Sequence, residues 1–278
     1  MNPGFRRRTR RAEKWFDRRR LKVADKQLSH HALHQPRRCV LETNAPEDIG
    51  IYLQPTRFID SDHPAVIAFA KDASGDAGSD PERAIRIFYA VRDRIRYDPY
   101  CIDLTEDKFK ASTVLQKKVG YCVEKALLLT AAARALGVPG RLRFADVRNH
   151  LTTERLKEIM QTDLFIYHGY TEIFLNDRWV KATPTFNLSL CERFGVKPLD
   201  FDGEHDAIFH EFDRRGNRHM EYVHDHGPFA DLPYDLIMDS FRKHYPIYFT
   251  QDASSPAGDF EAEAARDGKT QRPGRPDA

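Results

Sequence analysis

Cysteine is scarce in this sequence, with four residues in 278, at irregular spacing and without a C-x-x-C pair. That pattern excludes a disulfide scaffold, offers no zinc-site spacing, and favours a reducing cytoplasm. The sequence also lacks any apolar run near the roughly 20 residues of a membrane-spanning helix. The N-terminal segment lacks the apolar core of a signal peptide. We therefore expect a soluble, cytoplasmic protein without a membrane span.

Positive and negative residues are also nearly balanced over the whole sequence, with a formal net charge of +2 at pH 7. The balance hides an asymmetry: residues 1–38 contain 13 Lys or Arg and 3 Asp or Glu, a local charge of +10 that leaves −8 for the rest. Arginines clustered in residues 6–20 could make weak contacts with nucleic acid or an anionic membrane. A solvated, flexible extension explains the same composition, and it is the interpretation that we favour.

Composition divides the chain into three parts. Residues 1–38 are the basic extension, residues 39–250 carry the apolar periodicity of a globular domain, and residues 251–278 are rich in Ser, Pro, Gly and charge. A segment of the last kind cannot bury enough apolar surface to fold, so we expect a disordered tail there. The histidine clusters show no convincing ligand spacing, so we expect neither a metal nor a cofactor.

Within the domain, helical signals come before strand signals. Caps and apolar periodicity predict helices over residues 64–69, 80–95, 111–116, 122–136, 152–160 and 231–245. Alternation predicts strands over 141–147, 166–175 and 178–182, and a second hairpin that joins 207–212 to 219–223. Helices followed by an antiparallel sheet define an α+β fold.

The stretch that begins at Gly120 carries the strongest functional signal. Cys122 is followed by a run of Ala and Leu that ends at Gly137, which is typical of a buried helix with a left-handed C-terminal residue. Gly120 allows a sharp turn just before that helix. Cys122 is therefore expected in the first helical turn, where unpaired N–H groups and the helix dipole favour a thiolate. A buried structural cysteine is the alternative.

Three motifs in order resemble the core of the transglutaminase-like superfamily. The first is Gly-x-Cys-x-Glu-x-Ala over residues 120–126, the second is His-Gly-Tyr-Thr-Glu over 168–172, and the third is Trp-Val-Lys-Ala-Thr-Pro-Thr over 179–185. The resemblance covers roughly residues 109–187. The spacings of 46 residues from Cys122 to His168 and 15 from His168 to Thr183 make the combination more specific than any one motif.

The resemblance implies a papain-like fold in which Cys122, at the start of a helix, faces His168 on the neighbouring antiparallel sheet. In such a pair the imidazole takes the thiol proton and later returns it to the leaving amine. The N–H of Cys122 would receive the oxyanion. Gln116, six residues earlier, has the spacing of the oxyanion-hole glutamine of papain-like proteases.

One departure from the family pattern is Thr183, which stands where the family carries Asp. A threonine hydroxyl can accept a hydrogen bond from the His168 ring and fix its tautomer, but it supplies no negative charge. Neutralising the corresponding Asp of serine-protease triads lowers turnover by about 10⁴, whereas a Cys–His pair depends less on it. An active dyad and a degenerate, non-catalytic site therefore both stay open.

Further polar residues near these motifs are candidates for the oxyanion hole, the cleft or a substitute third group. They are Tyr121, Asp146, Asn149, Tyr170 and Asn187. Asp146 and Asn149 end a predicted strand, where they could either line the cleft or close a loop.

The sequence thus predicts cysteine-dependent amide acyl transfer, with hydrolysis of a protein or peptide substrate favoured. The catalytic residues would be Cys122 and His168, with Thr183 in place of the family Asp. Two alternatives remain: a degenerate transglutaminase-like module that binds a peptide, and a true transglutaminase that accepts an amine. The sequence does not define the substrate or the oligomeric state.

Overall fold

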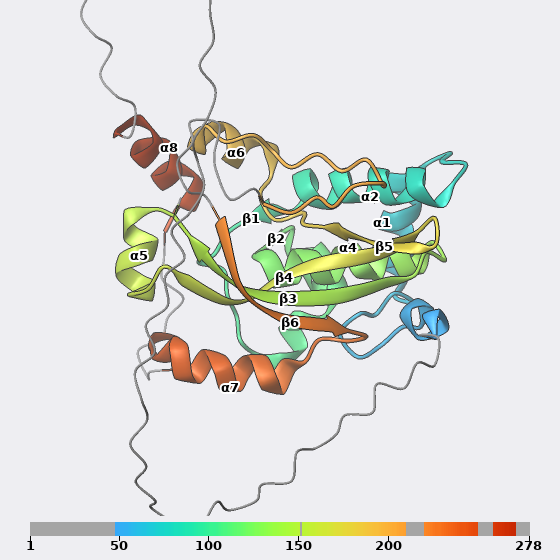
Figure 1. Cartoon of the computed structure of the whole chain (residues 1–278), viewed down its shortest axis with the longest axis horizontal. Helices are drawn as coiled ribbons and strands as arrows, with labels where there is room; N and C mark the ends of the chain where they lie inside the picture. Colours follow the sequence, from blue (N-terminus) through green and yellow to red (C-terminus); the bar gives the residue numbers. More distant parts are fainter. Residues whose placement is uncertain (1–47, 151, 210–219, 250–257, 271–278) are drawn as a thin grey trace, which may run out of the picture. The chain divides into compact units, whose positions relative to one another are not determined.

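The computed structural model describes residues 48–150, 152–209, 220–249 and 258–270, and it has the predicted α+β architecture (Figure 1). The described segments before the main sheet are η1 (Ile49–Leu53), α1 (Pro64–Ser74), α2 (Asp80–Arg94), β1 (Arg96–Tyr97), η2 (Glu106–Phe109), α3 (Ala111–Lys117), β2 (Val119–Gly120) and α4 (Cys122–Ala135). They are followed by β3 (Gly140–Asn149), α5 (Glu154–Met160), β4 (Leu164–Leu175), β5 (Arg178–Ala182), α6 (Leu188–Phe194), β6 (Met220–Phe229), α7 (Tyr234–His244), η3 (Pro246–Phe249) and α8 (Phe260–Thr270).

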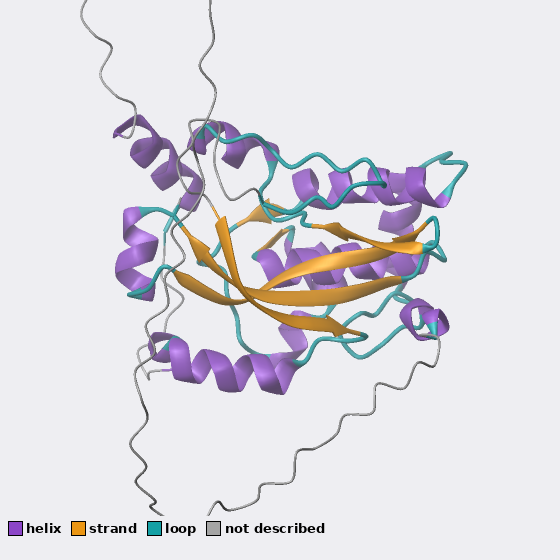
Figure 2. Ribbon diagram, viewed as in Figure 1, coloured by secondary structure: helices purple, strands orange, loops and turns teal. Residues whose placement is uncertain are grey.

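The main sheet has four antiparallel strands in the order β5-β4-β3-β6, drawn as one twisted layer in Figure 2. The β4–β5 hairpin turns at Asn176 and Asp177, which both have positive φ, at 49° and 60°. These two residue types tolerate the left-handed region of a two-residue hairpin turn, as the sequence predicts. A separate parallel pair, β1 with β2, leads the chain into α4.

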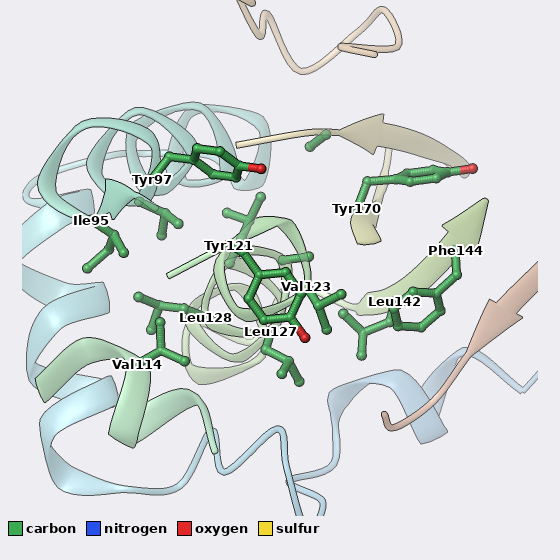
Figure 3. Packing of buried hydrophobic residues seen from close by; sticks show 14 of the residues in the cluster. Ile95, Tyr97, Val114, Tyr121, Val123, Leu127, Leu128, Leu142, Phe144 and Tyr170 are labelled. Carbon is green, nitrogen blue, oxygen red and sulfur yellow. The ribbon is translucent and has the colours of Figure 1, made fainter. Parts of the chain in front are cut away.

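Helix α4 is the central element of the core. Its side chains are buried on all sides, as the Ala and Leu content predicts, and α1, α2, α3 and β4 pack around it. Figure 3 shows Leu127 and Leu128 of α4 between Val114 of α3 and Leu142 of β3. Gly137 follows the helix with φ of 76°. The predicted left-handed C-terminal residue is therefore confirmed.

A buried lysine joins α4 to the end of α2. Lys125 Nζ donates to the carbonyl oxygens of Arg92, at 2.9 Å, and Ile95, at 2.6 Å. The side chain is fully buried, and burial lowers its pKa to about 7. Carbonyl groups at a helix C-terminus have no intrahelical partner, so the lysine satisfies acceptors that would otherwise be buried alone.

The predicted second hairpin is wrong over the described residues. β6 pairs with β3, at one edge of the sheet, whereas Ala207 bridges Ala182 of β5 at the other edge. A local turn signal favours pairing of sequence neighbours, but the long β3 edge offers β6 more backbone partners. The proposed turn, 214–217, lies outside the described residues.

The expected disordered tail is wrong over α8. Phe260 is buried among Tyr97, Tyr100 and Phe194, and Glu263 Oε2 accepts a 2.6 Å hydrogen bond from the Tyr100 hydroxyl. One aromatic anchor and one buried carboxylate therefore dock a segment that its composition describes as polar. Residues 251–257 and 271–278 of the expected tail, and the basic extension 1–38, lie outside the described residues. Within the described part of the chain, no helix combines the length and apolar character needed to cross a membrane.

Candidate active site

Cys122 is the first residue of α4, as predicted, and the buried carboxylate of Glu124 caps the start of the helix. Glu124 Oε2 accepts from the N–H of Tyr121 at 3.2 Å, and Glu124 Oε1 lies 2.5 Å from Lys117 Nζ. A Cβ on Gly120 would lie 3.0 Å from Glu124 Cβ and Oε2. Glycine at this position therefore makes room for the carboxylate that fixes the start of the helix. Burial raises the pKa of Glu124, and Lys117 opposes that shift.

The second motif crosses the start of α4 at very close range. A Cβ on Gly169 would lie 2.9 Å from Val123 Cα, so no larger residue fits there. The residue that follows His168 therefore packs directly against the residue that follows Cys122. The backbone N–H groups of Gly169, Val123 and Cys122 act to lower the pKa of the Cys122 thiol. Burial raises the pKa of the Cys122 thiol to about 11, against the opposing effect of these three donors.

His168 is buried in β4, and its Nε2 has no hydrogen-bond partner. Its ring lies 5.9 Å from the ring of Phe209 and 6.5 Å from that of Tyr170. Burial lowers its pKa to about 4. The imidazole is therefore neutral at physiological pH, which leaves it able to accept a proton.

Thr183 is also buried, and its hydroxyl has no hydrogen-bond partner. The predicted bond between this hydroxyl and the His168 ring is therefore not formed. The Thr183 N–H donates to the carbonyl of Ala207 at 2.9 Å, just beyond the end of β5. Alternation from the pair Thr171–Ala182 places Thr183 on the face of the sheet that carries Tyr170 and His168.

One pocket contains both the sulfur and the imidazole. Its walls come from α4, β4, α5, α7, η3 and the segment after β1. The lining is formed by Tyr97, Pro99, Ile102, Tyr121, Cys122, Leu156, Met160, Phe165, Ile166, Tyr167, His168, Phe241, Tyr245 and Tyr248. Tyr121, one of the predicted cleft residues, is thus in the site, and its buried hydroxyl has no partner.

Gln116 is not at the pocket. It lies near the end of α3 with an exposed side chain, and it does not belong to the pocket lining. The six-residue spacing does not bring it to the sulfur, because α3 ends at Lys117 and Lys118 turns the chain with φ of 55°. Tyr170 likewise lies outside the lining, buried near Tyr222 with ring centroids 6.4 Å apart.

Asp146 supports the backbone next to His168 instead of lining the pocket. The β3–β4 register changes between Ala145, which is opposite His168, and Val147, which is opposite Phe165. Tyr167, left out of the ladder with φ of 52°, donates its N–H to Asp146 Oδ1 at 3.0 Å. The same oxygen lies 2.7 Å from His226 Nε2, and the His226 ring stacks on Tyr167 at 4.0 Å.

The two predicted asparagines have structural positions outside the pocket lining. Asn149 ends β3, and its N–H donates to the carbonyl of Asp163 at 3.0 Å. Asn187 precedes α6: its Oδ1 accepts from the Tyr97 N–H at 3.0 Å, and its Nδ2 donates to Glu261 of α8 at 3.1 Å. Asn187 therefore joins β1 to α8. Among the described residues, no group of three or more His, Cys, Asp or Glu is arranged to hold a metal ion.

Sequence reasoning missed most of the pocket wall. Leu156 and Met160 of α5, Phe241 of α7, Tyr245 and Tyr248 form one side of the pocket. Their apolar periodicity indicates only a buried face, and nothing in it marks a ligand site. The contact of Gly169 with Val123 was equally invisible, although Gly169 stands between two motif residues.

Comparison with known proteins identifies the central part of the chain. Residues 67–184 match the family model of the transglutaminase-like superfamily. The resemblance predicted from the three motifs is therefore confirmed over this stretch, which includes Cys122, His168 and Thr183.

Solved structures give weaker likenesses. One is described as a "Putative Cysteine Protease from Cytophaga hutchinsonii", with 19% identity, 51% of this chain and 43% of that chain covered, and a TM-score of 0.40. Another is a "putative protease" from Parabacteroides distasonis, with 17% identity, 51% and 26% covered, and a TM-score of 0.32. This chain thus spans less than half of either protein. No curated protein matches the sequence.

Proposed function

We propose that this protein is a cysteine-dependent acyl-transfer enzyme that hydrolyses a peptide or amide, with Cys122 as nucleophile and His168 as proton acceptor. The observation that carries the proposal is the junction of α4 and β4, where Gly169 packs against Val123 and one pocket is lined by both Cys122 and the neighbouring His168. The match of residues 67–184 to the transglutaminase-like superfamily supports the same class of chemistry.

In the proposed reaction the resting pair is neutral, since the pKa of Cys122 is about 11 and that of His168 about 4. As the sulfur attacks the carbonyl carbon, its proton passes to the imidazole and an S–C bond forms. The N–H groups at the start of α4 can donate to the resulting oxyanion. Collapse of the tetrahedral intermediate breaks the C–N bond, and the imidazolium gives its proton to the leaving amine.

The second half of the reaction hydrolyses the thioester. Water attacks the acyl carbon while His168 accepts its proton, and breaking the S–C bond releases the acid and restores the thiol. Thr183 gives the imidazolium no counter-charge at either step. We therefore expect the thiol, and later the water, to transfer its proton to His168 during the attack on the carbonyl carbon. In a preformed ion pair the thiol proton would be transferred before the attack.

Acylation of Cys122 tests this proposal. The protein is incubated with an activated phenylacetyl ester, and intact mass and peptide mapping follow the modified residue. Removing the base in His168→Ala should slow acylation of Cys122 by about 10²-fold or more, and Cys122→Ala should abolish it. Cys101 is the matched control, because burial raises its pKa to about 11 as well but it is outside the pocket lining.

Equal acylation of Cys101 and Cys122, or a His168→Ala variant that reacts at the rate of the wild type, would contradict the proposal. Folding of each variant is checked by thermal unfolding. The second candidate, a degenerate module that binds a peptide without cleaving it, is favoured by the unpartnered Thr183 hydroxyl and His168 Nε2. Peptide binding without acylation of Cys122 would establish it.

A further inference from the structure

We propose that the pocket beside Cys122 selects an uncharged aromatic or bulky apolar group on the acyl side of the substrate. The inference rests on the proposed function and concerns the substrate class. Every residue of the lining is neutral at physiological pH, because burial holds the pKa of His168 at about 4 and the other thirteen have apolar, phenol or thiol side chains. A charged substrate group would lose its hydration there without gaining a partner.

The aromatic wall of the pocket is held rigidly. The Tyr245 hydroxyl donates to the carbonyl of Leu164 at 2.9 Å and accepts from the N–H of Ile166 at 2.7 Å, which fixes the segment after α7 to the start of β4. The Tyr248 hydroxyl donates to Met160 Sδ at 3.4 Å, which joins η3 to α5. A wall fixed before binding loses little conformational entropy when a ligand is bound.

The ring geometry favours an aromatic guest. Tyr245 is in edge-to-face contact with Phe241 and with Tyr248, at centroid distances of 5.2 Å and 6.4 Å. A further ring in the pocket could extend this arrangement, in which the positive edge of one ring meets the negative face of another. An aliphatic group would gain the apolar burial alone.

Two residues of the lining, Tyr121 and His168, each carry a buried polar atom without a hydrogen-bond partner in the protein, Oη and Nε2 respectively. Buried polar groups are normally hydrogen-bonded, and the proposed ligand can supply a partner if either group turns toward the pocket. An amide or ester attached to an apolar body has the required donor or acceptor. The ligand class is therefore a neutral acyl compound whose only polar group is the one that reacts.

Three alkylating reagents of different side group test the inference on the full chain at pH 9. They are N-benzyl-iodoacetamide, iodoacetamide and iodoacetylglycine, which present an aromatic, a minimal and an anionic group. The rate constant at Cys122 is measured by peptide mapping and divided by that of glutathione with the same reagent. We expect the normalised rate to be at least about tenfold higher for the benzyl reagent than for iodoacetamide, from burial of the ring. The anionic reagent should be at least about tenfold slower than iodoacetamide.

Tyr248→Ala removes part of the wall and should reduce the preference for the benzyl reagent several-fold. Phe249→Ala is the matched control, because Phe249 is an exposed aromatic of the same short helix outside the lining. Equal normalised rates for the three reagents, or equal losses in both variants, would overturn the pocket assignment even if acylation of Cys122 succeeds. If the three reagents rank as expected but the activated ester does not acylate Cys122, the pocket assignment stands and the hydrolytic function is overturned. A Cys122 that none of the reagents modifies would overturn the pocket assignment.

Discussion

Thr183→Asp should stabilise the imidazolium form of His168 and so increase the population of the Cys–His ion pair, and the pH dependence of Cys122 alkylation should reveal it. In the wild type the thiol has a pKa of about 11 and the imidazole about 4, so neither is charged near pH 7. Thr183 lies on the face of the sheet that carries His168 and has an unpartnered hydroxyl. A carboxylate at this position can accept a bond from the ring and stabilise its charged form.

The expected size of the effect follows from Coulomb's law. A carboxylate about 4 Å from the imidazolium stabilises it by roughly 4 kcal/mol at an effective dielectric constant near 20. That corresponds to about 3 pKa units, which would raise the pKa of His168 from about 4 to roughly 7. Part of this gain is lost to desolvation of the new carboxylate, which also destabilises the fold by about 1–3 kcal/mol.

The wild-type thiol should react slowly at neutral pH. A pKa of about 11 leaves about 10⁻⁴ of the thiol ionised at pH 7, against about 3% for a free cysteine of pKa near 8.5. The higher intrinsic nucleophilicity of a more basic thiolate recovers about tenfold of that deficit. Alkylation of wild-type Cys122 should therefore be about 20-fold slower than that of a free cysteine.

Iodoacetamide rates between pH 5 and 10 distinguish the two states, with Cys101 as internal reference because its pKa is also about 11. The wild-type rate at Cys122 should rise about tenfold per pH unit without a plateau. Thr183→Asp should raise the rate near neutral pH, because the stabilised imidazolium lets a larger fraction of the pair exist as thiolate and imidazolium. Thr183→Ala should match the wild type, because the hydroxyl makes no hydrogen bond. Three identical profiles would show that residue 183 does not contact the pair, and a plateau in the wild type would refute the neutral resting state.

Three further predictions concern the elements that position the site. Gly169→Ala forces a Cβ to 2.9 Å from Val123 Cα, so it should lower the free energy of unfolding by about 1–3 kcal/mol and slow Cys122 acylation. Urea titration measures the change in unfolding free energy. Gly78→Ala is the control, because Gly78 has open space around it and the substitution should leave the unfolding free energy unchanged. Lys125 has a folded-state pKa of about 7, below its unfolded value near 10.4, so its contribution to stability increases as pH rises through that interval. The unfolding free energy of the wild type minus that of Lys125→Met should therefore grow by about 1.4 kcal/mol per pH unit from pH 7.5 to 9.5. A difference that stays constant over this range would contradict the shift. Truncation before α8 removes the Phe260 and Glu263 contacts and should lower the melting temperature by several degrees, whereas an unchanged temperature would show that the helix is not needed for stability.

Local signals in the sequence were sufficient for the elements that carry the motifs. Helix α4 is predicted because its Ala and Leu content favours a helix and Gly137 marks where that helix ends. The β4–β5 hairpin is predicted because alternation and the Asn176-Asp177 turn fix both its strands and its register. These features depend on neighbours a few residues apart, and the structure retains them. The placement of Cys122 at a helix start and of His168 on a strand follows from them.

The remaining features depend on contacts between distant segments. Strand β6 pairs with β3, which is distant in the sequence. A local turn pattern does not determine which strand of the sheet a later segment pairs with. Helix α8 is held by Phe260 and Glu263, two residues in a polar segment that composition describes as disordered. Gln116 had the expected spacing, but spacing does not determine which way a side chain points at the end of a short helix.

The origin of the pocket walls separates the chemistry from the selectivity of the proposed enzyme. Cys122 and His168 lie within residues 67–184, the stretch that matches the transglutaminase-like superfamily. Phe241, Tyr245 and Tyr248 come from α7 and η3, well beyond that stretch. The Tyr245 hydroxyl binds the backbone of Leu164 and Ile166, so the later segment attaches directly to the strand that carries His168. Changes in this segment could therefore alter the accepted acyl group while the sulfur, the imidazole and the N–H donors at the start of α4 stay in place.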